Sequence, residues 1–210
     1  MKNIQCLNFD FGNVIAFFDH RKACRQLAKI SNGNFSENQV YAEIFKPGGL
    51  EEKYDRGMIS TDKFISQLKE QFQLDASQKE IENAWSDIFW PNKDVINLIP
   101  ILRRMSYQLI LASNTNELHY NWYRVKFASV LQNFHGRVLS HIEKCRKPDT
   151  EFFQKCIEQS KCLPSECVFI DDREDYVNVA CDLGMRGVTY VSIADLIQRL
   201  EDFGIVIRNS

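Results

Sequence analysis

The fold is decided by a stretch near the N-terminus, residues 4–13, which reads IQCLNFDFGN. A short apolar run that stops at an aspartate and a Gly-Asn pair is typical of a buried strand entering a tight loop. The same pattern recurs at 107–116 (YQLILASNTN) and 167–172 (CVFIDD). Residues 187–191 (GVTYV) form a fourth run, and residues 137–140 (RVLS) a weaker fifth. We therefore predict about five buried strands.

Helical patterns separate these strands. Apolar residues recur at helical spacing in four segments, 96–105, 152–157, 177–183 and 196–200. Strands that alternate with helices predict an α/β fold: a Rossmann-like parallel sheet core with helices on both faces. Crossovers in such sheets are right-handed, so the carboxyl ends of all strands meet at one edge. Folds of this kind bind their ligands at that edge.

Residues 17–92 break the alternation. This stretch shows no convincing strand, and its apolar spacing predicts only amphipathic helices at 21–30, 37–45, 61–72 and 78–89. We interpret it as an inserted, all-helical cap that lies over the edge of the sheet. The predicted domains are a Rossmann-like catalytic core made of residues 1–16 and 93–210, and a helical cap made of residues 17–92.

The composition excludes several classes of protein. The chain has 210 residues, of which 44% are hydrophobic and 26% charged, and its net charge is −2, which is ordinary for a globular domain. The basic run at 144–147 is too short to mark a nucleic-acid-binding surface. No stretch has the apolar length of a membrane span or of a signal peptide. We expect a cytoplasmic protein without nucleic-acid or membrane partners; its oligomeric state is not indicated.

The seven cysteines fit that compartment. They form no CxxC pair and no zinc spacing, so they are interpreted as reduced thiols. Cys145 is flanked by Lys144 and Arg146, and neighbouring cations lower a thiol pKa. A reactive thiol is one interpretation of Cys145, and an incidental loop cysteine is the favoured one.

Polar residues of complementary types follow the predicted strands. Asp10 ends the first strand, and residues 113–115 (Ser-Asn-Thr) end the second. Lys147 follows the weak strand, and the pair Asp171–Asp172 ends the strand at 167–170. An aspartate after a strand is often only a turn residue, and Ser-Asn-Thr could simply cap a helix. Four such clusters at one sheet edge favour a catalytic interpretation instead.

These residue types suit phosphoryl transfer through a covalent intermediate. A carboxylate nucleophile divides the hydrolysis of a phosphate monoester into two easier steps. A second carboxylate helps to hold Mg²⁺, which screens the nucleophile against an anionic phosphate. Lysine, hydroxyl and amide donors stabilise charge on the transferring oxygens. Asp10 is the predicted nucleophile of this set.

The sequence also resembles a known family. Residues 9–15 (FDFGNVI), 111–116 (LASNTN), 146–149 (RKPD) and 169–172 (FIDD) are similar, in order, to the four motifs of the haloacid dehalogenase superfamily. The predicted cap resembles that superfamily's type 1 cap, and the first motif resembles that of small sugar-phosphate phosphatases, which reads Asp-x-Gly-Asn-Val. The resemblance covers nearly the whole chain.

The resemblance implies a role for each matching residue. Asp10 would be the nucleophile and a Mg²⁺ ligand, together with the Gly12 carbonyl and Asp172. Ser113 and Asn114 would bind phosphate. Lys147 would be a catalytic residue that pairs with both the phosphate and Asp10. The side chain supporting the metal ligands would be Asp171. The expected substrate is a small phosphorylated metabolite, such as a sugar phosphate, and the cap would select it.

The chain departs from the family pattern at two positions. Most phosphatases of the superfamily carry a second aspartate two residues after the nucleophile, as acid and base, where this chain has Gly12. We expect slow turnover unless another group, such as Asp19 or His20, replaces it. Tyr176 stands where the fourth motif usually has Asn or Asp, and the neighbouring Asp175 is expected to support the metal site in its place.

Two other functions are compatible with parts of the pattern. A metal-independent dehalogenase also uses an aspartate nucleophile and does without the second aspartate. The acidic pair at 171–172 argues against it, because a halide site is disfavoured by added negative charge. The third hypothesis is a catalytically weak relative that binds a phosphorylated ligand or a protein, as Gly12 and Tyr176 would allow.

Overall fold

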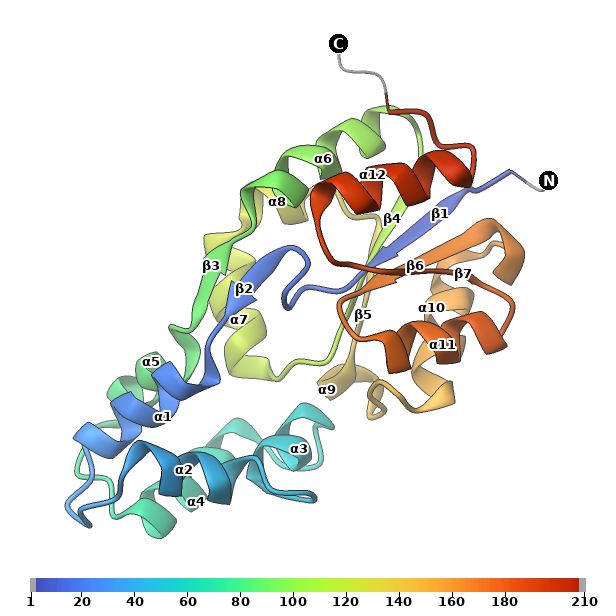
Figure 1. The fold of residues 1–210 in the computed structure, drawn as a ribbon. Helices are drawn as coiled ribbons and strands as arrows, with labels where there is room; N and C mark the ends of the chain where they lie inside the picture. Colours follow the sequence, from blue (N-terminus) through green and yellow to red (C-terminus); the bar gives the residue numbers. More distant parts are fainter. Residues whose placement is uncertain (1–2, 208–210) are drawn as a thin grey trace.

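The computed structural model describes residues 3–207. It contains one five-stranded sheet, one two-stranded ribbon and helices around them (Figure 1). The strands are β1 (Cys6–Phe9), β2 (Ala16–Phe18), β3 (Phe89–Pro91), β4 (Gln108–Ser113), β5 (Gly136–Leu139), β6 (Cys167–Asp171) and β7 (Arg186–Thr189). The helices before β4 are α1 (His20–Lys29), α2 (Glu37–Ile44), α3 (Leu50–Asp55), α4 (Thr61–Phe72), α5 (Gln78–Ser86) and α6 (Lys93–Arg104). Those after it are α7 (Glu117–Lys126), α8 (Ala128–Leu131), α9 (Ser140–Glu143), α10 (Thr150–Ser160), α11 (Glu174–Asp182) and α12 (Ile193–Asp202), with a 3₁₀ turn, η1 (Pro164–Glu166).

The large sheet has the order β5-β4-β1-β6-β7, and all neighbouring pairs are parallel. The predicted fold class is therefore confirmed, and the weak strand at 137–140 is the edge strand β5. None of the described helices has the length and apolar character that crossing a bilayer requires.

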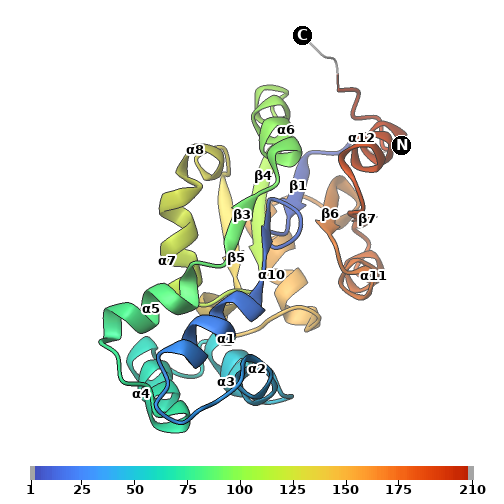
Figure 2. The same ribbon diagram turned by 60° about the vertical axis from the view of Figure 1, so that its left-hand side comes forward.

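The two faces of the sheet are covered by different helices (Figure 2). Side chains alternate between the faces of a strand, so odd and even positions enter different layers. Leu7, Phe9 and Leu109 pack with buried residues of α6, α7 and α12. Ile110 and Phe169 pack on the other face with buried residues of α10 and α11. This double cover explains why the strands are apolar throughout rather than alternating with polar residues.

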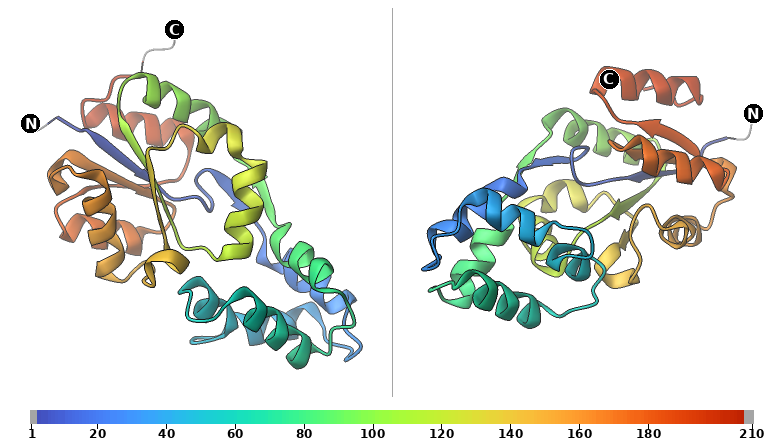
Figure 3. Two further views of the ribbon diagram at one scale, coloured as in Figure 1. Left: turned by 180° about the vertical axis from the view of Figure 1, so that it is seen from behind. Right: turned by 60° about the horizontal axis from the view of Figure 1, so that its bottom comes forward.

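The helices α1 to α5 have an apolar core of their own. Buried side chains between Ala23 and Ile88 form a cluster that includes Phe64, Phe72 and Trp85. Figure 3 shows these helices at one end of the molecule, beyond the carboxyl ends of the strands. This separate cluster supports the division into a core and a cap, which we keep as a proposal; below, residues 17–92 are called the cap.

The expectation that residues 17–92 contain no strand is wrong. β2 and β3 pair antiparallel, with Phe17 opposite Trp90, and form the two-stranded ribbon through which the chain enters and leaves the cap. Each strand has three residues, too few to show alternation, and the two are about seventy residues apart in sequence, so only the folded chain reveals them. The short helix α3 was also not predicted, and the predicted helix at 78–89 ends at Ser86.

The cap contacts the core through α5, which packs on α7, and through α3 and the turn after it. Arg56 forms an ion pair with Asp149, and Lys144 Nζ donates to the Gly57 carbonyl at 2.7 Å. Gly57 has a φ of +58°, and a Cβ there would lie 2.2 Å from the carbonyl oxygen of His141. Glycine is therefore required at this contact both by its backbone conformation and by the close approach of the core.

Candidate active site

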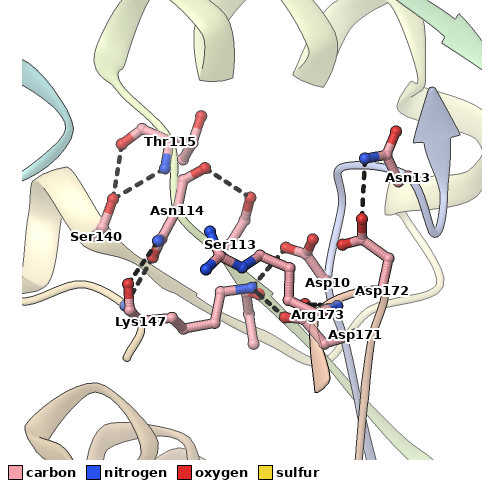
Figure 4. A network of polar contacts seen from close by, with 11 residues as sticks. Asp10, Asn13, Ser113, Asn114, Thr115, Ser140, Lys147, Asp171, Asp172 and Arg173 are labelled. Carbon is pink, nitrogen blue, oxygen red and sulfur yellow. Dashed lines mark hydrogen bonds and ion pairs between the residues drawn. The ribbon is translucent and has the colours of Figure 1, made fainter. Parts of the chain in front are cut away.

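The polar clusters predicted from the four strand ends meet around one lysine (Figure 4). Lys147 is 1% exposed, and its Nζ donates to Asp10 Oδ1 at 2.8 Å and to Asp171 Oδ2 at 2.6 Å. It also donates to the Ala112 carbonyl at 3.1 Å. Burial lowers the pKa of Lys147, but the two carboxylates more than reverse this and raise it above its usual range. The ammonium group therefore stays charged and ties β1, β4 and β6 together.

Asn114 holds the segment that carries this lysine. Its Nδ2 donates to the Lys147 carbonyl at 2.9 Å, and its Oδ1 accepts from the Lys147 N–H at 2.8 Å. The predicted role of Asn114 was phosphate binding, but its side-chain amide is engaged with the backbone of Lys147. The side chain thus positions Lys147. Ser113 is buried at the end of β4 and lines the cavity beside Asp10.

The helix after β4 begins later than its sequence suggests. Ser113 still belongs to β4. The Thr115 N–H donates to the Ser140 hydroxyl, and that hydroxyl donates to the Thr115 carbonyl, both at 2.9 Å. The residue that caps α7 is Asn116, whose side chain accepts from His119 N. The Ser-Asn-Thr run therefore spans the end of β4 and the loop after it, and it is not itself the helix cap.

Three carboxylates gather at the same edge. Asp10, Asp171 and Asp172 each offer an oxygen within 4.8 Å of the others. Asp171 is fixed by Lys147 and by the Arg173 N–H at 3.0 Å, and Asp172 Oδ2 accepts from Asn13 Nδ2 at 3.0 Å. Asn13 has a φ of 54°, a conformation that asparagine tolerates better than most residues. Asn13 is a positioning residue that the motif alone did not identify.

The carboxylate cluster has more negative charge than its lysine balances. Burial raises the pKa of Asp10 to about 7, against the opposing effect of Lys147 and with a further contribution from Asp171. Burial likewise raises the pKa of Asp172, although Asn13 opposes this. Both shifts mean that the site favours either protons or an added cation. Carboxylate oxygens are the ligands that Mg²⁺ prefers, so these residues fit the predicted metal.

The expectation for Asp175 is not met. Its carboxylate pairs with the Arg173 side chain at 2.7 Å, is 54% exposed, and does not line the cavity. Tyr176 lines it instead, with its ring centroid 5.4 Å from Lys147 Nζ. One helical step of about 100° separates neighbouring side chains, so only one of the two can face the site. Tyr176 forms an aromatic wall beside the lysine.

Gly12 lines the cavity next to Asp10, and an aromatic ring fills the space beside it. A Cβ at Gly12 would lie 2.7 Å from Cε1 of Phe18 and 3.7 Å from Asp10 Oδ2. The ring of Phe18 therefore lies where a side chain at position 12 would begin. The carbonyl of Gly12 as a metal ligand stays a prediction.

We expect Gly12→Ala to lower the free energy of unfolding by about 1–3 kcal/mol, because the added methyl overlaps the Phe18 ring. Urea unfolding of Gly12→Ala, Phe18→Leu and the double variant measures this. The loss in the double variant should be smaller than the sum of the single losses, as for residues in contact. Strictly additive losses would show that Phe18 does not occupy this space.

Above the carboxylates lies a cavity of ≈ 280 Å³ between core and cap. The cap contributes Phe18, His20, Glu51, Asp55 and Phe89 to its lining, and the core contributes Arg146 as well as most of the predicted residues. Glu51 and Asp55 could not be identified from sequence, because only the docked cap brings them over Asp10. Arg146 stands in the RKPD motif, but nothing in the sequence indicates that it would pair with Glu51 of the cap.

Cys145 and Asp19 lie outside the cavity, whereas His20 lines it. Cys145 is 2% exposed, and burial raises the pKa of its thiol to about 11, so the reactive interpretation is not supported. Asp19 does not line the cavity; its side chain accepts from Arg21 N at 2.9 Å and caps α1. His20 does line the cavity, and burial lowers its pKa, so the imidazole is neutral near pH 7.

Comparison with known proteins finds one hydrolase family and phosphatases among its members. Residues 5–177 match the model of the haloacid dehalogenase-like hydrolases. A D-ribitol-5-phosphate phosphatase of Bacteroides thetaiotaomicron is 29% identical over 203 residues, which is 94% of this chain and 97% of the relative. A sesquiterpene phosphatase of Aspergillus oryzae is 26% identical over 65% of this chain and 70% of its own length.

A solved structure is similar over almost the same length. It is a haloacid dehalogenase family enzyme of Bacteroides thetaiotaomicron, crystallised in complex with magnesium and inorganic phosphate. The TM-score is 0.77 and the sequence identity 26%, over 90% of this chain and 95% of that one. The likeness thus includes both the sheet and the cap.

Proposed function

Because the chain belongs to the haloacid dehalogenase-like hydrolases, we propose that it is a Mg²⁺-dependent phosphatase acting on a small phosphorylated metabolite. The relatives named above are phosphatases of small molecules, and the similar enzyme was crystallised with magnesium and phosphate. The observation that carries the proposal is the placement of Asp10 in one cluster with Asp172 and the buried Lys147.

In this proposal Asp10 attacks the phosphorus atom and forms an aspartyl phosphate, which water then hydrolyses. Mg²⁺ held by Asp10, Asp172 and the Gly12 carbonyl would supply the positive charge that allows a carboxylate to approach a phosphate. Lys147 orients Asp10 and offers its charge to the phosphate oxygens, and Asp171 keeps Lys147 in place. The Ser113 hydroxyl is the side-chain donor for phosphate at the end of β4.

The dehalogenase alternative is less consistent with the geometry. A halide leaving group needs a site that tolerates its negative charge, whereas three carboxylates lie within 4.8 Å of one another here. Two of them already have raised pKa values, so an added anion without a cation would be unfavourable. The cluster favours a metal-bound phosphate.

The cysteines support a reducing compartment. All seven are free thiols, and five of them are buried. Disulfides are rare in the cytosol and common outside it, so free thiols of this number favour a cytoplasmic location. Small phosphorylated metabolites are the substrate class we propose there.

The decisive experiment is phosphate release from a panel of esters, with Mg²⁺ and with chelator. The panel includes D-ribitol 5-phosphate, hexose phosphates, a sesquiterpenyl phosphate and 4-nitrophenyl phosphate. We expect turnover that requires Mg²⁺ and falls to background in chelator, because the carboxylates cannot bind phosphate without a cation. Folded protein that binds phosphate but turns over no ester would instead identify a phosphate-binding relative.

A further inference from the structure

The geometry of phosphoryl transfer fixes where the leaving oxygen must lie. The attacking and leaving oxygens stand roughly in line, on opposite sides of the phosphorus atom. Asp10 lies at the end of β1, on the core side of the cavity, so a leaving oxygen faces the cap. An acid that protonates it must therefore come from the cap side of the lining.

On the core side His119 also lines the cavity, but burial lowers its pKa to about 3, so its imidazole is neutral and a weak acid near pH 7. Position 12 offers no side chain suited to this task. Gly12 has none, and the apolar ring of Phe18 occupies the space beside it, as shown above. Lys147 and Asp171 are bound to each other and lie with Asp10 below the phosphate position. An alkyl leaving group nevertheless needs a proton, because an alkoxide is a strong base.

On the cap side, Glu51 of α3 lies between the positively charged Arg146 and a second carboxyl group, that of Asp55. The Glu51 side chain is 14% exposed, and its Oε2 lies 3.6 Å from Arg146 Nη1, on the segment that also carries Lys147. Asp55, one helical turn later, accepts from Asn116 Nδ2 at 2.9 Å and is almost fully buried. The two carboxyl groups thus lie near one guanidinium, which opposes the effect of burial on both, but burial still raises the pKa of each.

The charges around Glu51 favour its protonated form. Burial raises the pKa of Glu51 to about 8, and Asp55 on the same helix adds to the effect. Arg146 from the core and His20 from α1 act in the opposite direction but do not reverse it. Near pH 7 Glu51 is therefore a neutral acid that lines the cavity opposite Asp10.

The other cap residues are poorer candidates. Burial lowers the pKa of His20, so its imidazole is neutral and a weak acid near pH 7. Burial raises the pKa of Asp55, as it does that of Glu51, but Asp55 is almost fully buried and its side chain accepts from Asn116 Nδ2, which anchors it to the start of α7. Phe18 and Phe89, the other cap residues that line the cavity, have no ionisable group. Glu51 is therefore the best-placed acid of the five.

We propose that Glu51 is the acid that protonates the leaving oxygen and then the base that activates water; this assignment rests on the proposed phosphatase function. In the first step the bond from Asp10 to phosphorus forms, the ester P–O bond breaks, and the departing oxygen takes the Glu51 proton. In the second, a water oxygen bonds to phosphorus, its proton passes to the Glu51 carboxylate, and the bond to Asp10 breaks.

The test compares esters that differ in their need for a proton. For Glu51→Gln we expect kcat/KM to fall about 10²–10⁴-fold on phenyl phosphate and on alkyl phosphates. On 4-nitrophenyl phosphate, which has nearly the same shape, the loss should be only a few-fold, because nitrophenolate leaves without a proton. Glu51→Asp, which keeps the acid, should recover part of the phenyl phosphate activity. Glu70→Gln, at an exposed position of α4, is the matched control.

The pH profile gives an independent readout. For native protein, kcat/KM on phenyl phosphate should fall above about pH 8, because Glu51 loses its proton there and a general acid must be protonated. This basic limb should be absent in Glu51→Gln. Retention of the limb, or equal losses on the phenyl and nitrophenyl esters, would overturn the assignment of Glu51 alone. Failure of native protein on every ester would instead overturn the phosphatase proposal.

Discussion

Hydrolysis should be lost in Asp10→Asn, by a factor on the order of 10⁴–10⁶, as when other covalent enzymes lose their nucleophile. An amide oxygen cannot form the phosphoryl intermediate, and no other carboxylate has the same position, because Asp171 is bound to Lys147 and Asp172 to Asn13. The measurement is phosphate release with Mg²⁺ from the best ester of the panel, with native protein and Asp10→Asn at equal concentration.

The same variant should not lose stability. The pKa of Asp10 is raised to about 7 in the folded protein, so the folded state favours its protonated form. Stability contributed by this group is therefore lost as the pH rises from about 4 to about 7, and asparagine removes that loss. Thermal unfolding of metal-free protein at pH 4 and pH 8 should show Asp10→Asn nearly equal to native at pH 4 and more stable at pH 8. A large destabilisation would mean that lost activity reflects misfolding.

The second large effect is expected for Lys147→Met, which should reduce both stability and activity. Methionine has a similar length but leaves Asp10 and Asp171 buried without their cation. Breaking a buried ion pair from one side costs about 3–5 kcal/mol. Urea unfolding measures this loss, and Lys93→Met, at an exposed position of α6, controls for the substitution itself.

Mg²⁺ distinguishes electrostatics from packing in that variant. If the loss comes from uncompensated carboxylates, added Mg²⁺ should recover part of the stability of Lys147→Met and change Lys93→Met no more than native protein. A loss of less than about 1 kcal/mol, or one that Mg²⁺ leaves unchanged, would show that the lysine does not hold the cluster together. Turnover should stay low in either case, because the donor to the phosphate oxygens is gone.

The sheet and most cap helices could be predicted because their signals are local. Apolar runs ending in Asp10 and Asp171 specify buried strands, and helical spacing specifies helices such as α4, which begins and ends where predicted. The ribbon β2–β3 could not be predicted in this way, because each strand is only three residues long and its partner lies far along the chain.

Within the site, residue types were easier to predict than side-chain directions. The sequence placed Asp10, Lys147 and Asp172 at one sheet edge, and the structure brings them together. It could not tell that the Asn114 amide binds backbone, because that depends on how two loops approach each other. Glu51 was missed for the same reason: its neighbour Arg146 is nearly a hundred residues away and meets it only when the cap docks.

We expect a substrate to reach Asp10 by rotation of the cap about the ribbon β2–β3. The base of the ribbon is fixed by Asn92, which donates to the Val14 carbonyl and to the Tyr190 hydroxyl at 2.8 Å each. Such a rotation would leave the cap's own apolar core intact, but it would separate the ion pair of Arg56 with Asp149 and the stacked rings of Trp85 and His119. Because Glu51 belongs to the cap, we expect the proposed acid to reach the phosphate position only when the cap closes.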